Sequence, residues 1–355
     1  MHFWKRTILC LLLLLFSTVA SAKIVFLSKH GKHVDFDGFF LFEGVYEIYA
    51  MEDNGSDLTL ITTSQDVGHP RWSADGNQIV YSAHSTIHLM NADGTNIQHI
   101  THPIKNKMFD CCPTFSPDGE KVAFTRTEEI NRTQENNTIV LHLKTGKLEK
   151  IANHYIISPD WSPDGKQIVF LIHDVPFIGT GGNVYIMDSD GGNMRRLVPE
   201  APQGELFITR HSPRWSPNGK QILYTQEEFT QKRKDPNGII NTPKAYRYYI
   251  CNLNGETVRQ LNIPIHWDPG SIDWADNGKS VVFSARQIKL NEPELPPDEA
   301  PSSNIYKYHI ATEKITTLLE RPVSDIAVDW VSNSPYVVSP AGKLTLQWGH
   351  LKQAD

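Results

Sequence analysis

Short hydrophobic runs, divided by polar turns, recur along nearly the whole chain. One such run is Gln167-Ile-Val-Phe170, and the others are equally rich in Val, Ile, Phe and Tyr. β-Branched and aromatic residues in runs of this length favour strands. Asp-Gly and Asn-Gly pairs stand between many of the runs and are strong signals for tight hairpins. The pattern therefore predicts an all-β chain of short antiparallel strands.

A longer motif contains these runs and repeats with small changes. It reads RWSADGNQIVYSA, TFSPDGEKVAFTR, DWSPDGKQIVFLI, RWSPNGKQILYTQ and DWADNGKSVVFSA, and its aromatic recurs at 72, 115, 161, 215, 274 and 330. After each motif come two more strand patterns joined by a second turn. A repeat of roughly 40 to 60 residues with four short strands is the signature of a β-propeller.

The two ends of the chain complete one another. The segment from Lys23 to about residue 62 has the last three strands of a blade but no Trp strand before them. Residues 326–340 carry a Trp strand with no hairpin after it. We therefore predict a six-bladed β-propeller of four-stranded antiparallel blades whose first blade is closed by the C-terminal strand, which leaves no open sheet edge. The propeller is expected over 23–340, and the tail 341–355 is expected to pack near the seam.

The first 22 residues predict a secretory signal peptide. Lys5 and Arg6 precede an apolar run from Ile8 to Phe16, and Ala20-Ser-Ala22 fits a cleavage site. The run is too short to span a bilayer. A retained membrane anchor is the alternative, and the fit of the cleavage site favours removal. We expect an exported monomer, periplasmic or extracellular, with no membrane-spanning segment.

Charge and cysteine content narrow the classes of partner. Loss of Lys5 and Arg6 changes the formal net charge from −6 to −8, which argues against nucleic acid because phosphate binding needs a basic patch. Beyond the signal, Cys111, Cys112 and Cys251 remain, an odd number that gives no disulfide framework. The adjacent Cys111 and Cys112 could form a strained disulfide, bind a soft metal or stay as buried thiols, which is the simplest reading.

The repeat resembles a known family. Trp161-Ser-Pro-Asp-Gly-Lys-Gln-Ile-Val-Phe170, followed by the strand and turn at 184–191, resembles the TolB-like propeller repeat, also described as a WD40-like PD repeat. The resemblance covers nearly all of the chain after the signal and implies a propeller that lacks the N-terminal α/β domain of TolB proper. Related repeats occur in prolyl oligopeptidase-type peptidases, but this chain has no Gly-x-Ser-x-Gly nucleophile elbow.

Loop lengths suggest which face of the propeller is functional. The connections between second and third strands are expected at about 29–44, 126–137, 173–183, 226–245 and 286–303, and they vary far more than the turns. The face that carries them, together with the connections between blades, is called here the variable-loop face. Function concentrates in irregular loops on a rigid scaffold. We expect a protein or peptide partner to bind there.

Potential ligand side chains lie where the inner strands enter from this face. They are His69, Asp110, His154, His211, His266, Asp268 and Asp325, with Cys111 and Cys112 beside Asp110. His, Cys and Asp suit a divalent metal, so a metal-dependent lyase or hydrolase acting on a polysaccharide or peptide is the alternative function. No tight ligand spacing such as Cys-x-x-Cys supports it. Separate polar residues are the simpler reading, and we expect a binding protein without a cofactor.

The residue before each repeated aromatic alternates in charge. These six residues are called here the ring residues: Arg71, Thr114, Asp160, Arg214, Asp273 and Asp329. If they face the central channel, Asp329 and Arg71 are neighbours, as are Asp160, Arg214 and Asp273. We expect these charges to neutralise one another in a structural role. The alternative is a channel that binds a small polar ligand through Arg71 and Arg214.

Overall fold

The computed structural model describes residues 23–30, 45–62, 67–102, 104, 107–130, 133–172, 182–200, 205–234, 238–293, 295 and 299–332. Within these ranges the chain forms six four-stranded antiparallel sheets and one 3-10 helix, η1 (Asp276–Gly278). The predicted signal peptide at 1–22 and the predicted tail at 341–355 lie outside the described residues. No helix in the described part is long and apolar enough to cross a membrane.

Each sheet is one blade, and its strands follow one another in sequence except in the first blade, where β24 precedes β1. From the inner to the outer strand, the blades are β24 (Asp325–Val331), β1 (Lys23–His30), β2 (Val45–Glu52), β3 (Thr59–Thr62); β4 (Val67–Trp72), β5 (Gln78–Ala83), β6 (Thr86–Asn91), β7 (Gln98–His99); β8 (Met108–Phe115), β9 (Lys121–Ile130), β10 (Thr133–His142), β11 (Leu148–Ala152); β12 (Ile156–Trp161), β13 (Gln167–Ile172), β14 (Asn183–Asp188), β15 (Arg195–Arg196); β16 (Phe207–Trp215), β17 (Gln221–Lys234), β18 (Gly238–Asn252), β19 (Thr257–Gln260); and β20 (Trp267–Ala275), β21 (Ser280–Gln287), β22 (Asn304–His309), β23 (Lys314–Leu319).

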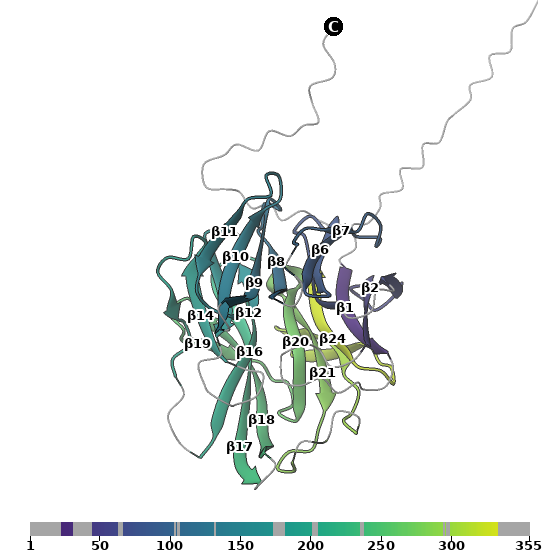
Figure 1. The fold of residues 1–355 in the computed structure, drawn as a ribbon. Coiled ribbons are helices and arrows are strands. Elements are labelled where there is room, and N and C mark those ends of the chain that lie inside the picture. Colours follow the sequence, from purple (N-terminus) through teal and green to yellow (C-terminus); the bar gives the residue numbers. More distant parts are fainter. Residues whose placement is uncertain are drawn as a thin grey trace, which may run out of the picture.

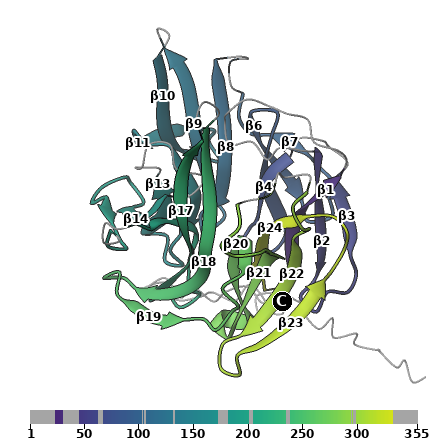
Figure 2. The same ribbon diagram turned by 90° about the horizontal axis from the view of Figure 1, so that it is seen from below.

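The blades surround a common axis (Figures 1 and 2). Each inner strand contacts the next one, and β20, β24 and β4 complete the circle. The first blade contains β24 beside β1, with Ile24 opposite Trp330. The predicted six-bladed propeller, closed by its C-terminal strand, is therefore confirmed.

The Ser-Pro-Asp-Gly motif forms the turn between the first and second strands. Ser162 Oγ donates to Asp164 Oδ1 at 2.7 Å and accepts from the backbone N–H of Gln167 at 2.9 Å. Gly165 sits at φ 71°, where a residue with a Cβ is strained. The same side-chain pattern recurs at Ser73, Ser116 and Ser216, so one local motif starts four blades.

The glycine of the second turn allows close contact between blades. Gly191 has φ 90°, and a Cβ built on it would lie 1.8 Å from the backbone oxygen of Ile151 in the preceding blade. Gly55, Gly94 and Gly255 make the equivalent approach to the outer strand before them. The Asp-Gly or Asn-Gly pair of the second turn therefore also allows neighbouring blades to pack closely.

Two of the connections expected to be loops are long hairpins. β9 pairs with β10 as far as Ile130 opposite Thr133, and β17 pairs with β18 as far as Lys234 opposite Gly238. Figure 1 shows β17 and β18 reaching beyond the rest of their blade, and Figure 2 shows the same for β9 and β10. The prediction of loops at 126–137 and 226–245 was wrong because cross-strand pairing extends through these polar segments.

Candidate functional site

The ring residues lie at the ends of the inner strands, around the propeller axis. Arg71 Nε lies 2.8 Å from Asp329 Oδ1, and Arg71 Nη2 lies 2.5 Å from Asp160 Oδ1. These contacts join three blades. The predicted pairing of Asp329 with Arg71 is confirmed, and the two carboxylates raise the pKa of Arg71 although burial opposes them.

The carboxylates of the ring also hold the backbone of the neighbouring inner strand. Asp329 accepts from the N–H of Trp72 at 2.7 Å, and Asp160 accepts from the N–H of Trp215 at 2.7 Å. Asp273 accepts from the N–H of Trp330 at 2.8 Å. Each of these three acids therefore links its own blade to the next, which is a structural role.

Asp160, Arg214 and Asp273 are neighbours but do not form the expected direct ion pairs: burial and Arg71 lower the pKa of Arg214, and the two acids oppose this. Arg214 lies within ion-pair distance of no carboxylate in the described part of the chain, and its Nη1 donates instead to the backbone oxygen of Pro213 at 2.9 Å. Asp160 is already bound by Arg71, which reaches past the blade of Thr114. The spacing of the ring residues along the sequence could not predict this contact between Arg71 and Asp160.

A backbone bulge in most inner strands places a second layer of residues beside the ring. His69, Cys112, Ser158, Ser212 and Ala327 occupy it with positive φ, two positions before the ring residue of their strand. His69 Nδ1 lies 3.3 Å from Ser82 Oγ, and His69 Nε2 lies 3.7 Å from Cys112 Sγ. Burial and then the charge of Arg214 lower the pKa of His69 to about 4, so its imidazole is neutral at neutral pH.

Cys111 and Cys112 are free buried thiols. Their sulfur atoms are 3.4 Å apart, and Cys111 Sγ lies 3.4 Å from the hydroxyl of Tyr155. The hydrogen bond with Cys111 and then burial raise the pKa of Cys112 well above its ordinary value. Of the three readings of this pair, the structure has the buried thiols.

The three other acidic candidates are paired with arginines. Asp110 accepts two bonds from Arg126, which lies directly opposite on β9, at 2.7 and 2.8 Å. Asp268 accepts from Arg286 at 2.5 Å in the same cross-strand position of another blade. Asp325 is bound by Arg321 at 2.5 Å. Since each carboxylate has its own cation, these pairs stabilise individual blades.

The histidine candidates are dispersed. His211 Nε2 lies 3.1 Å from Thr209 Oγ1 and 3.7 Å from Glu227 Oε2, while the backbone oxygen of His266 accepts from the N–H of Ile288 at 3.0 Å. Among the described residues, no three His, Cys, Asp or Glu side chains lie close enough together to hold a metal ion. The nine candidates therefore do not form one constellation.

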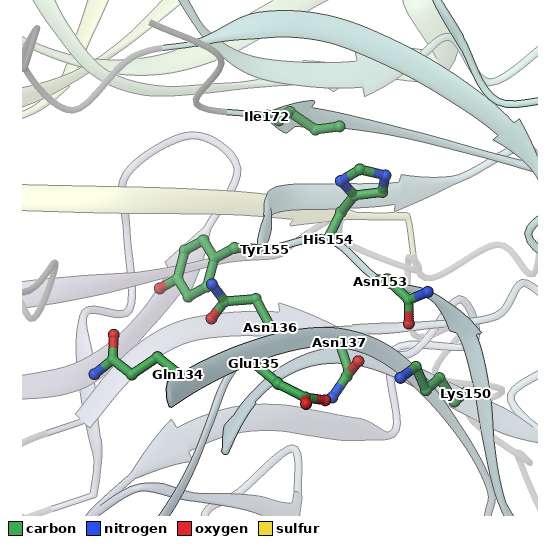
Figure 3. A pocket seen from close by; sticks show the side chains of 9 residues that line it. All are labelled: Gln134, Glu135, Asn136, Asn137, Lys150, Asn153, His154, Tyr155 and Ile172. Carbon is green, nitrogen blue, oxygen red and sulfur yellow. The ribbon is translucent and has the colours of Figure 1, made fainter. Parts of the chain in front are cut away.

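His154 lies in a separate polar pocket between two blades. The pocket has a volume of about 640 Å³ and is lined by Gln134, Glu135, Asn136, Asn137, Lys150, Asn153, His154, Tyr155 and Ile172. Figure 3 shows the side chains of β10 and Lys150 on one side, with His154 and Ile172 on the other. Carboxamides that both donate and accept hydrogen bonds dominate it. Sequence reasoning missed all of these except His154, because 126–137 was read as a loop.

Ten of the twelve exposed large apolar side chains among the described residues form two groups with different origins, and the other two, Leu60 and Leu148, lie on the outer strands β3 and β11. Leu58, Ile97, Met194 and Val258 each lie three residues after the glycine of the second turn, so they belong to the repeat. Ile104, Ile130, Leu206, Phe207, Ile265 and Leu295 instead lie where inner strands enter or in second-to-third connections, on the variable-loop face. This second group was also missed, and its departure from the repeat is the signal that could have revealed it.

A family model described as the TolB beta propeller domain matches residues 82–232. Two curated proteins align with 52% of the chain at 25% identity. They are the "Uncharacterized peptidase YuxL" of Bacillus subtilis strain 168, over 215 residues and 31% of its length, and the "Tol-Pal system protein TolB" of Francisella tularensis subsp. mediasiatica, over 193 residues and 41% of its length. The match thus spans less than half of either relative.

The fold is similar to that of a solved TolB. The crystal structure of TolB from Acinetobacter baumannii superposes with a TM-score of 0.61 and 18% identity, over 88% of this chain and 67% of that one. At this identity the likeness concerns the fold alone. The superposition covers more of the chain than the 82–232 matched by the family model.

Proposed function

The chain is a TolB-like β-propeller, and from this premise we propose that it is an exported scaffold that binds a protein partner on its variable-loop face. The observation that carries the proposal is the group of apolar side chains on that face. Phe207 is 37% exposed, Leu295 53% and Ile104 60%, although no blade repeat requires them there. Six exposed apolar side chains on this face, beyond those of the repeat, favour it as the interaction surface.

The long hairpins support the same face. β9 with β10 and β17 with β18 extend the scaffold on the side where the inner strands enter, and Phe207 stacks on Phe229 of β17 at 5.8 Å. Aromatic side chains held by a rigid strand are common anchors in protein interfaces. The similarity to a protein named for the Tol-Pal system supports a partner in the cell envelope, and the predicted signal peptide supports export.

The metal-dependent lyase or hydrolase has no comparable support. The acids that would serve it are engaged by Arg126, Arg286 and Arg321, and the described histidines do not converge. Scaffold binding is therefore the function that the geometry favours.

Site-specific photo-crosslinking in cells tests the proposal. A photo-reactive phenylalanine analogue replaces Phe207 or Leu295 in the full chain, and matched controls carry it at Ile97 or Val258, which are exposed repeat positions on outer strands. We expect a discrete protein adduct from the first pair and none from the second. Adducts of equal yield from both pairs, or none from Phe207 and Leu295, would overturn the proposal.

A further inference from the structure

Backbone hydrogen bonds close several seams between blades on the variable-loop face. At these seams the third strand bonds to the next blade, or to the connection leading into it, two positions before its pairing with the fourth strand begins. The bonded pairs are Ser85 O with Asp110 N at 3.0 Å, Gly182 with Arg210 in both directions at 2.9 and 3.1 Å, Tyr246 N with Ile265 O at 2.8 Å, and Ser303 O with Asp325 N at 2.9 Å. One repeated position therefore joins neighbouring blades at four seams.

The seam between the third and fourth blades lacks this bond. The equivalent position in β10 is Asn136, two residues before Thr138, where pairing with β11 begins opposite Ala152. No described residue bonds to the backbone of Asn136 on this side. β10 nevertheless continues back to Thr133, paired with β9 along its other edge. In the described part of the chain, the outer edge of β10 is therefore open from Thr133 to Asn137.

The open edge lies at the pocket that contains His154 (Figure 3). Backbone groups of successive strand residues point to opposite edges, and those of Thr138 point outward to Ala152. The N–H and C=O groups of Gln134 and Asn136 therefore also point outward, and both residues line the pocket. Its volume of about 640 Å³ is in the usual range of ligand sites.

The side chains beside this edge suit peptide groups. The carboxamides of Gln134, Asn137 and Asn153 line the pocket and make no hydrogen bond with any described residue. Asn137 is only 4% exposed, and a buried carboxamide without a partner is costly. A carboxamide offers the same donor and acceptor as a peptide group. Apart from the histidine, the lining has one acid, Glu135, and one base, Lys150, so it does not favour a strongly charged ligand.

We propose that the outer edge of β10 binds an extended peptide segment of the protein partner, which adds a strand along Thr133–Asn137. Strand addition takes its affinity from main-chain bonds and its specificity from flanking side chains. The segment supplies at Asn136 the bond that the chain itself supplies at four other seams. A neutral oligosaccharide is the competing ligand for the carboxamides, but it lacks the regular main-chain spacing that an edge strand matches.

This inference rests on the proposed function, because the segment belongs to the proposed protein partner. The two surfaces are nevertheless separate. The edge is on the third blade, whereas Phe207 lies on the fifth blade and Leu295 in a connection of the sixth. Loss of binding at one surface can therefore be measured while the other is intact.

A displayed library of short random peptides, selected on the purified chain, supplies the probes. Fluorescence anisotropy then measures the affinity of each selected peptide. Asn136→Pro removes the outward N–H, and an open edge tolerates proline because that N–H has no internal partner. Asn136→Ala is the matched control, since it also loses the bond from Thr127 but keeps the N–H. We expect affinity to fall about tenfold or more in Asn136→Pro and to stay within about threefold in Asn136→Ala.

A backbone scan of the peptides on wild type keeps the test independent of how any variant folds. N-methylation of one peptide residue at a time removes one N–H. Strand addition predicts losses at every second residue, because alternate residues face β10. Losses without this alternation, or equal effects of Asn136→Pro and Asn136→Ala, overturn the inference.

The remaining outcomes separate this site from its alternatives. Peptides that lose affinity in Phe207→Ala but not in Asn136→Pro support the proposed function and overturn the β10 edge as the binding site. Failure to select any peptide also overturns it, while the crosslinking at Phe207 still tests the proposed function. Maltotriose and chitotriose are the saccharide probes, and NMR line broadening by wild type that disappears in Asn136→Ala assigns the pocket to saccharides instead.

Discussion

Replacement of the two ring arginines by methionine should have very different consequences for stability. Arg71→Met leaves Asp160 and Asp329 buried without the cation that both contact, at 2.5 and 2.8 Å. Breaking a buried pair typically costs about 3–5 kcal/mol in free energy of unfolding. Arg214→Met removes a charge that has no carboxylate within ion-pair distance in the described part of the chain, and it loses two bonds to carbonyls. Its expected effect is within about 1 kcal/mol of zero.

Urea unfolding gives the difference in free energy of unfolding and thermal unfolding gives the difference in Tm, both followed by tryptophan fluorescence. Unfolding entropy is about 2.1 cal/mol/K per residue, so roughly 300 residues give about 0.6 kcal/mol/K, and Arg71→Met should lower Tm by about 5–8 °C. Arg214→Met should leave Tm nearly unchanged. If Arg214→Met is as destabilising as Arg71→Met, then Arg214 is paired in the folded protein and the reasoning about the ring fails.

Three other predictions follow from the described contacts. Gly191→Ala should lower the free energy of unfolding by roughly 2 kcal/mol or more, because its Cβ would meet the oxygen of Ile151. Gly146→Ala, which has open space around it, should lower it by about 1 kcal/mol in the same urea assay. Equal losses would refute the packing argument. Wild type should lose stability as pH falls from 6.5 to about 4, since the unfolded imidazole of His69 takes up a proton that the buried one refuses, and a His69→Gln variant that loses just as much would contradict this. Ellman's reagent should react with Cys112 only after unfolding, because the thiol is buried and its pKa is raised. Rapid reaction in the native state would contradict this and show that the reagent reaches the thiol in the folded protein.

The fold could be predicted because its determinants are local and repeated. Ser162, Asp164 and Gly165 form their turn with neighbours in the sequence, and a Ser, an Asp or Asn and a Gly recur at the same places in three other blades. The aromatic spacing then fixes the number of blades. Closure could also be inferred, because the N-terminal and C-terminal segments each lack what the other supplies.

The candidate site depends on contacts between distant residues, and sequence spacing does not determine these. Arg71 and Asp160 are 89 positions apart, and with this contact Arg214 has no carboxylate within ion-pair distance among the described residues. The arginines opposite Asp110 and Asp268 depend on cross-strand register, which sequence reasoning did not assign. The pocket at His154 requires the β9–β10 hairpin, whose polar sequence resembles a loop.

Closure of the ring by β24 also has a consequence for biosynthesis. The N–H of Trp72 donates to Asp329, which the ribosome adds 257 residues later, and β1 gains its inner neighbour at the same late point. Until then β1 has an unpaired edge, and exposed strand edges recruit other chains. A product that stops before Asp325 would therefore lack β24. It would also keep the edge of β1 permanently exposed. We expect such truncated copies to aggregate rather than to persist as smaller propellers.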